Sequence, residues 1–198
     1  MPDTTPGQVE DRCSAPVRRG DVPYDRRMRI LFVCTGNICR SPTAERLTTA
    51  FGAESGRDDL VAHSAGTRAV VGSGMEPTAA LVLQHLGGDP DGFAARRLTS
   101  AIAEDADLIL TMSEEHRGEV IKLAPQMMRV AFTLSEAARV QQASGAASVA
   151  ELAAARTQLP ASGPEDIVDP IGRDEETFVE VGSEIADLLL PLLARIRA

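Results

Sequence analysis

Short apolar runs alternate along this chain with longer segments in which apolar residues recur every three or four positions. Runs of the first kind are typical of strands buried on both faces, and the second spacing is typical of amphipathic helices. The sequence predicts strands at residues 29–33, 60–64, 108–112 and 128–132. It predicts helices at residues 41–51, 77–86, 99–105, 113–123, 134–160 and 178–192.

Capping and breaking residues refine the helices. Ser41 and Ser113 each stand where a hydroxyl can cap the helix that follows. The Ser-Gly pair at 144–145 is expected to break the Ala- and Gln-rich helix. Pro191, which has no N–H, is expected to kink the last helix or end it early.

The alternation of strands and helices favours an α/β fold, a single three-layer domain with a four-stranded parallel sheet and helices on both faces. The length of 198 residues suits one domain of this kind. Such sheets bind ligands at the carboxyl ends of their strands. We therefore expect a site in the turn after the first strand, at residues 34–40.

The first 27 residues lack this patterning. They are rich in proline and show no periodic apolar positions. We interpret residues 1–27 as a flexible N-terminal tail in front of a domain that spans residues 28–198. Alternatively, the segment is not part of the native protein and Met28, just before the first strand, is the true start.

Composition excludes several classes of function. Hydrophobic residues make up 43% of the chain and charged residues 25%, which is enough apolar material for a core and argues against global disorder. A net charge of −9 disfavours nucleic-acid binding, which needs basic groups to neutralise phosphates. Aromatic residues, at 3%, are too scarce for platforms on which bases stack.

Compartment and membrane signals are equally sparse. No apolar run approaches the roughly 20 residues that a membrane helix needs, so no membrane partner is expected. The first residues lack the charged-then-apolar layout of a signal peptide. Three cysteines in 198 residues do not make a disulfide framework, so we expect a cytoplasmic protein.

The turn after the first strand reads Cys34-Thr-Gly-Asn-Ile-Cys-Arg40-Ser41 and carries the candidate chemistry. Gly36 and Asn37 tolerate a positive φ, so successive N–H groups can turn inward and form a nest for an anion. The following helix adds its positive dipole end, and the Arg40 guanidinium can bind two phosphate oxygens at once. Such a cradle favours the thiolate of Cys34, and the Ser41 hydroxyl can hydrogen-bond its sulfur. The pattern predicts a nucleophile beneath a bound phosphate.

Three other interpretations of this turn compete. A cysteine after a buried strand is often a small buried hydrophobe without chemistry. Cys34 and Cys39 have a spacing that allows zinc binding, but no second pair of ligands stands at a suitable spacing. A nucleotide-binding P-loop needs Gly-Lys-Ser/Thr, and the single lysine of the chain is Lys122. The strand-to-helix context favours the nucleophile.

Five segments resemble the low-molecular-weight protein-tyrosine phosphatase family, in the family's order. They are ILFVCTGNICRSPTAERL at 30–47, HSAGT at 63–67, ARRLT at 95–99, ADLILTMSEEHR at 106–117 and IVDPIG at 167–172. The resemblance spans residues 28–196, with an extra stretch at 134–160. It implies a flavodoxin-like strand order, 2-1-3-4, and two-step phosphate-ester hydrolysis through a phosphocysteine, with no metal and no cofactor. The substrates it implies are a phosphorylated protein or a small aryl phosphate.

The resemblance also assigns roles to individual residues. Cys34 matches the nucleophile, Arg40 the phosphate-binding arginine and Asp169 the general acid. On chemical grounds, a carboxylate on a proline-stiffened loop can protonate the departing oxygen, but Asp before Pro is also common in turns. Ser64, together with Asn37 and Ser41, matches a polar network that shapes the loop. The implied substrate-binding residues are Thr35, Gly36, Asn37, Ile38, Cys39 and Ser41.

Some positions depart from the family pattern. Ile171 follows the Asp-Pro pair, and Val70 and Val71 occupy the loop after the second strand, where many phosphotyrosine-specific members have aromatic residues. Phe93 stands where well-studied members have a histidine that supports the loop. The nucleophilic chemistry survives these changes, and only a shallow preference for phosphotyrosine is expected.

The sequence leaves further alternatives open. Cys39 is either a partner that traps an oxidised Cys34 as a disulfide or a small buried residue. His63 and His116 have no partner at a telling spacing, so structural roles are expected for both. The competing functions are an arsenate reductase and a phosphate-binding module without turnover. The reductase would need an external thiol, because no cysteine follows Cys39.

Overall fold

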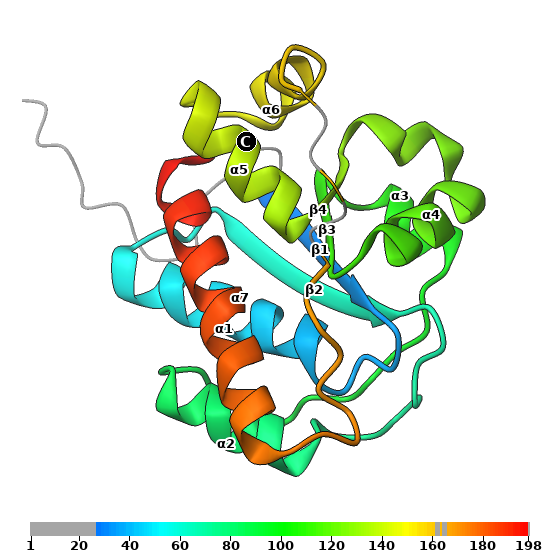
Figure 1. The fold of residues 1–198 in the computed structure, drawn as a ribbon, viewed down its shortest axis with the longest axis vertical. Helices are drawn as coiled ribbons and strands as arrows, with labels where there is room; N and C mark the ends of the chain where they lie inside the picture. The colour runs from blue at the N-terminus through cyan, green and yellow to red at the C-terminus, as the bar shows by residue number, and fades with distance from the viewer. Residues whose placement is uncertain (1–26, 161–162, 164–165, 198) are drawn as a thin grey trace, which may run out of the picture.

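The computed structural model describes residues 27–160, 163 and 166–197. At its centre is a sheet of four strands in the order β2-β1-β3-β4 (Figure 1). The strands are β1 (Met28–Cys34), β2 (Leu60–Gly66), β3 (Leu108–Thr111) and β4 (Ala131–Thr133). Every neighbouring pair is parallel, which confirms the predicted α/β fold and its strand order.

Helices cover both faces of the sheet (Figure 1). The larger layer packs on one face and consists of α1 (Arg40–Ser55), α2 (Pro77–His85), α5 (Leu134–Ser144), α6 (Val149–Arg156) and α7 (Glu175–Arg195). The opposite face carries α3 (Ser100–Glu104), α4 (Glu114–Leu123) and the 3₁₀ helix η2 (Pro125–Arg129). The arrangement is therefore the predicted three-layer sandwich.

The central strand β1 divides its side chains between the two cores. Ile30, Phe32 and Cys34 belong to the apolar cluster beneath α1 and α7. Leu31 and Val33 belong to the cluster beneath α3 and α4. This period of two follows from the pleat of the strand, and burial on both faces explains why the run is apolar throughout. The strand thus delivers Cys34 to the carboxyl edge of the sheet on a fixed support.

The fourth strand is displaced from its predicted position. The sequence predicts a strand at 128–132, but the first two of these residues lie in η2 and β4 follows. Pro125 suits the first turn of a helix, which favours the 3₁₀ conformation here. The Arg156 guanidinium also donates to the carbonyl oxygens of Met128 and Arg129, both at 3.1 Å. These carbonyls are therefore satisfied without strand pairing.

Helix α7 continues through Pro191 to Arg195, so Pro191 does not end it early, and the alternative expectation of a kink stays a prediction. The turn beyond the proline is held by buried Leu192 and Leu193. The Arg57 guanidinium adds hydrogen bonds to the carbonyl oxygens of Leu193 (2.9 Å) and Ile196 (3.0 Å). Burial of two leucines, worth roughly 1.5–3 kcal/mol each, offsets the roughly 3 kcal/mol that an interior proline costs.

Of the three serine and glycine residues predicted to cap or break helices, two act as predicted and one does not. Gly145, in the left-handed region with φ 72°, separates α5 from α6 as predicted. Ser113 caps α4 by accepting the His116 N–H. Ser41, in contrast, lies within the first turn of α1, whose N-cap is Cys39, and its hydroxyl is directed to the candidate site instead. The predicted tail at 1–27 lies almost wholly outside the described residues and stays a prediction.

A small apolar cluster connects the loop at 34–41 to two helices. It comprises Cys39, Ala79 and Val82 of α2, and Phe178 of α7. Close approach of the two helices depends on Gly182 in α7, because a Cβ there would lie 2.4 Å from Val82 Cγ1. A β-branched valine has few rotamers with which to relieve such a contact. The support beneath the loop therefore requires glycine at this position.

We expect Gly182→Ala to lower the free energy of unfolding by about 1–3 kcal/mol through this overlap. Gly118→Ala is the matched control, because Gly118 also lies in a helix and a Cβ there meets nothing within 4 Å. That change should raise stability by about 1 kcal/mol through helix propensity alone. Chemical denaturation of both variants measures the effect, and equal shifts would show that the α2–α7 contact adapts freely.

Candidate active site

The loop between β1 and α1 forms the floor of a cavity of about 250 Å³ at the carboxyl edge of the sheet. The predicted site residues Cys34, Arg40 and Asp169 all line it, although Asp169 is distant in sequence. The remaining lining residues are Thr35, Gly36, Ile38, Cys39, Arg68, Val70 and Ile171. Asn37, Ser41 and Ser64 do not line the cavity and lie beneath the loop.

Asn37 fixes the course of the loop. It is the one non-glycine residue with a positive φ, 55°, within the described ranges, and it is fully buried. Its side-chain amide donates to Ser41 Oγ at 2.9 Å and to Ser64 Oγ at 2.7 Å. Its Oδ1 accepts the Arg96 backbone N–H at 2.8 Å. Three hydrogen bonds from one buried side chain thus hold the loop at this turn.

The network beneath the loop has a direction. Ser64 Oγ donates to the Glu45 carboxylate at 2.5 Å, because an ionised carboxylate can only accept. The Asn37 amide donates one hydrogen bond to Ser41 Oγ and one to Ser64 Oγ. Because Ser41 Oγ is the acceptor in this bond, its own hydroxyl proton is left to be donated elsewhere. The partner of that proton is Cys34 Sγ, 2.9 Å from Ser41 Oγ. The chain of bonds therefore presents a donor to the sulfur and stabilises its anionic form.

Glu45 and Arg96 are parts of this network that the motif analysis missed. Glu45 stands four residues after Ser41 on α1, so helical periodicity places both on one face. That spacing was the one signal available for Glu45. The Arg96 N–H and its Nε, which donates to the Ser64 carbonyl oxygen at 2.8 Å, come from a loop whose position depends on the tertiary fold.

Arg40 is held from two sides. It is 5% exposed, its Nη1 donates to the Ile167 carbonyl oxygen at 2.9 Å, and its Nη2 donates to the Asp169 carboxylate. Asp169 is 46% exposed and also accepts the Ile171 N–H at 3.2 Å. The backbone contact fixes the guanidinium plane. The ion pair brings the predicted general acid into direct contact with the predicted phosphate-binding arginine.

Cys39 differs from Cys34 although both thiols are buried and free. Burial, followed by the nearby Cys34, raises the pKa of the Cys39 thiol well above its ordinary value, so Cys39 stays protonated. Its side chain packs in the apolar cluster with α2 and α7. The structure thus gives Cys39 a packing role, and a redox role for it stays a prediction.

His116 extends from α4 to the loop. Its ring is 5% exposed, with Nε2 2.9 Å from Thr35 Oγ1 and Nδ1 2.8 Å from Ser113 Oγ. Burial, with the charge of Arg40, lowers the pKa of His116 to about 4. The imidazole is therefore neutral near pH 7. His63, by contrast, is exposed on β2.

The rim of the cavity is apolar and aliphatic. Val70 and Ile171 are each about half exposed beside it. None of the described lining residues is aromatic. Phe93 instead lies under the Arg46 guanidinium, with the Arg46 Cζ 5.7 Å from the ring centroid. The walls can therefore contact an aryl ring without enclosing it between aromatic residues.

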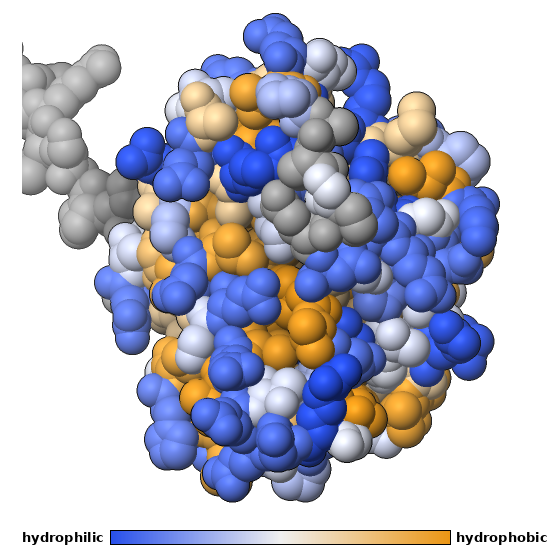
Figure 2. Space-filling view, viewed as in Figure 1, coloured by the Kyte–Doolittle hydropathy of each residue, from blue (hydrophilic) through white to orange (hydrophobic). Residues whose placement is uncertain are grey.

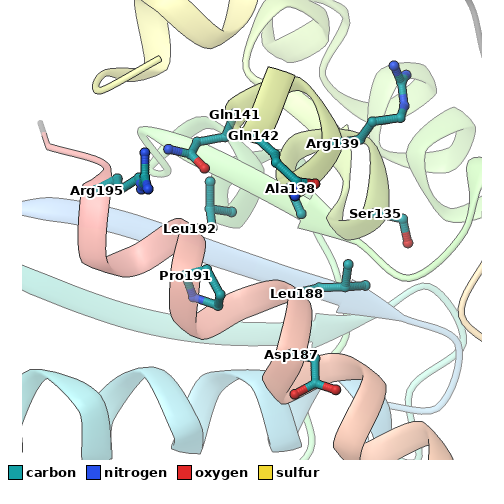
Figure 3. A pocket seen from close by; sticks show the side chains of 10 residues that line it. All are labelled: Ser135, Ala138, Arg139, Gln141, Gln142, Asp187, Leu188, Pro191, Leu192 and Arg195. Carbon is teal, nitrogen blue, oxygen red and sulfur yellow. The ribbon is translucent and has the colours of Figure 1, made fainter. Parts of the chain in front are cut away.

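A larger hollow of about 430 Å³ lies between α5 and α7 and contains none of the predicted site residues. Figure 2 shows apolar side chains near the middle of this face, within a mostly polar surround. In Figure 3, Leu192 points toward α5, whereas Asp187 and Arg139 extend away from one another. No set of reactive side chains converges there. The candidate catalytic residues lie instead at the loop after β1.

Within residues 27–160, 163 and 166–197, no three side chains among His, Cys, Asp and Glu gather in a way that could hold a metal ion. Over those ranges, no helix has the length and apolar character required to cross a bilayer.

The depressed pKa of His116 has a consequence for stability. An unfolded histidine titrates near 6.5 and the folded one near 4, so between these values the unfolded chain binds the extra proton. We expect His116 to lower the free energy of unfolding as the pH falls from 6.5 to 4, by at most about 1.4 kcal/mol per pH unit. Urea unfolding across this window measures the slope, which should be shallower in His116→Gln. Identical slopes would contradict a buried neutral imidazole.

The comparisons with known proteins agree with the geometry. The family model described as low molecular weight phosphotyrosine protein phosphatase matches residues 29–149. The low molecular weight protein-tyrosine-phosphatase Wzb of Escherichia coli (strain K12) is 43% identical over 98 residues, which make up 50% of this chain. The alignment covers 63% of Wzb, slightly under two thirds of its length.

Two solved structures extend the similarity over most of the chain. A low molecular weight protein tyrosine phosphatase from T. tengcongensis aligns with a TM-score of 0.66 and 30% identity, covering 84% of this chain and 97% of that one. The YwlE arginine phosphatase from Geobacillus stearothermophilus aligns with a TM-score of 0.64 and 29% identity, covering 84% and 90%. With the family model matching more than half of its residues, this chain belongs to the low molecular weight phosphotyrosine protein phosphatase family.

Proposed function

We propose that this chain hydrolyses aryl phosphate monoesters, including phosphotyrosine in proteins, through a phosphocysteine formed on Cys34. The observation that carries the proposal is the convergence of Cys34, Arg40 and Asp169 on one cavity above a locked loop. Residues 28–198 act as the catalytic domain in this proposal, with residues 1–27 outside it.

In the first step, the Cys34 thiolate attacks phosphorus and the bond from phosphorus to the ester oxygen breaks. The incoming phosphoryl group displaces the Asp169 carboxylate from Arg40 Nη2, while Nη1 keeps its bond to the Ile167 carbonyl. Released from the ion pair, the Asp169 carboxylate takes up a proton from solvent and gives it to the departing oxygen. Ser41 supports the sulfur through its hydroxyl proton.

In the second step, the Asp169 carboxylate takes a proton from water, and the water oxygen attacks phosphorus. The sulfur–phosphorus bond breaks, inorganic phosphate leaves, and the Cys34 thiolate is restored. The Ser41 hydroxyl again stabilises the anionic sulfur, now as the leaving group. Asp169 returns the extra proton to solvent when it pairs with Arg40 again, so the cycle balances with water as the one co-reactant.

The cavity supports an aryl ester over the alternative chemistry named for the YwlE relative. A phosphoarginine carries its positive guanidinium next to phosphorus, and Arg68 lines the cavity mouth with its side chain 74% exposed. Arg68 is itself paired with Glu115 at 3.4 Å, so the preference for an aryl ester rests on the walls: a neutral ring can pack on Val70 and Ile171. The same aliphatic walls predict only a shallow preference for phosphotyrosine over other aryl phosphates.

Replacement of the nucleophile tests the mechanism. We expect Cys34→Ser to reduce turnover of an aryl phosphate by on the order of 10⁴-fold or more, because a neutral hydroxyl is a poor nucleophile here. The variant should still bind inorganic phosphate, since Arg40 and the loop remain. Cys13→Ser is the matched control and should hydrolyse like the native chain. Substantial turnover by Cys34→Ser would exclude the phosphocysteine.

The contribution of Asp169 to kcat should depend on the leaving group of the substrate. We expect Asp169→Asn to reduce kcat on phosphotyrosine peptides by about 10²–10⁴-fold, because a tyrosyl oxygen needs a proton as its bond breaks. Activated nitrophenyl esters, whose phenol leaves unaided, should lose far less. Asp166→Asn is the control, because the exposed Asp166 accepts the Glu114 N–H, a bond that asparagine can keep. Equal losses of kcat on both esters would show that Asp169 has a structural role and does not protonate the leaving group.

A further inference from the structure

The catalytic loop is supported at two ends, and the mechanism above uses only one of them. Asn37, with Ser64 and Glu45, holds the end of the loop next to α1. The other end, directly after Cys34, is contacted by His116 from the layer on the opposite face of the sheet. His116 is a buried titratable group without a part in the steps described, and both of its ring nitrogens have partners.

The hydrogen bonds around His116 define a direction. Ser113 Oγ accepts the His116 backbone N–H at 3.2 Å, which leaves its own proton to be donated. Ser113 is 8% exposed, and a buried hydroxyl proton without an acceptor is costly, so it is donated to Nδ1 at 2.8 Å. A neutral imidazole then carries its proton on Nε2 and donates it to Thr35 Oγ1.

This direction leaves the Thr35 hydroxyl proton unused. The Thr35 oxygen accepts from His116, and the residue lines the cavity beside Cys34 and Arg40. The Thr35 backbone is fixed separately, because its carbonyl oxygen accepts the Arg68 N–H at 2.9 Å. Rotation of the side chain is therefore the freedom that remains to Thr35, and His116 removes it.

Burial keeps the imidazole neutral near pH 7. Burial and then Arg40 disfavour the imidazolium, whereas Glu115, Asp169 and Asp166 favour it. The balance lowers the pKa of His116 to about 4. Above pH 5 the imidazole therefore accepts from Ser113 and donates to Thr35 at the same time.

We propose that His116 is a positioning residue that orients Thr35 so that the Thr35 hydroxyl donates to a phosphoryl oxygen in the cavity. The inference rests on the proposed phosphatase activity and adds to it a neutral donor beside Arg40. The line of donation runs from Ser113 through His116 to Thr35 and ends on the anion. Such a donor strengthens as negative charge accumulates on the phosphoryl oxygens during transfer.

Four variants test the proposal by kcat, KM and the Kd for inorganic phosphate. Thr35→Val removes the hydroxyl at nearly constant shape and should lower kcat/KM by about 10- to 100-fold, as expected when a donor to a charged acceptor is lost. Thr35→Ser keeps the hydroxyl and should stay within about threefold of the native chain. His116→Phe should match Thr35→Val, and His63→Phe, at an exposed site, should change nothing.

The double variant Thr35→Val with His116→Phe separates positioning from mere packing. If His116 acts through Thr35, the double variant loses no more kcat/KM than either single variant, whatever the melting temperature does. Multiplied losses, or a Thr35→Val variant with native kcat/KM and phosphate affinity, would overturn the proposal. If His116→Phe fails to fold, Thr35→Val against Thr35→Ser still decides whether the hydroxyl is used.

Failure of the proposed function gives a different result. If the native chain binds phosphate but hydrolyses no aryl ester, the proposed phosphatase activity is contradicted. The Kd for phosphate would still report on this inference, since Thr35→Val and His116→Phe should both weaken it and Thr35→Ser should not. Equal phosphate affinity in all variants would by itself overturn the proposal that His116 orients Thr35 toward the anion.

Discussion

The left-handed backbone of Asn37 is the constraint on which the rest of the site depends. A non-glycine residue in this region costs roughly 1–2 kcal/mol, and here three hydrogen bonds from a fully buried side chain offset that cost. The turn places the Asn37 amide where it donates a hydrogen bond to Ser41 Oγ, and the Ser41 hydroxyl is then left to donate its own to Cys34 Sγ. The contact between Ser41 and Cys34 thus depends on the placement of one buried side chain.

Much of the fold follows from the sequence because its signals are local. The strands are apolar runs between helices, and alternation of this kind makes a parallel sheet almost obligatory. Two of the expectations that failed did so because tertiary contacts outweighed a local rule. Pro191 does not end α7, because buried leucines hold the next turn. The segment before β4 is a 3₁₀ helix, because the Arg156 guanidinium satisfies its carbonyls from across the fold.

The same division applies to the site. Cys34, Arg40 and Ser41 stand in one contiguous motif, so their use could be predicted from residue chemistry and spacing. Glu45 and His116 could not be assigned in this way, since each contributes through a single hydrogen bond to a residue that only the folded sheet brings near. The ion pair of Arg40 with Asp169 joins segments 129 positions apart. In the proposed mechanism, it is the contact that an incoming phosphoryl group displaces.

The central claim is that phosphate passes through a covalent bond to the sulfur at the base of this loop. Rapid acid quenching of the native chain during turnover of a ³²P-labelled aryl phosphate, followed by peptide mapping, tests it most directly. The account predicts label on the peptide that contains Cys34, at no more than one phosphate per chain, formed and lost at the rate of turnover. Turnover without bound label, or label on any other residue, would contradict it.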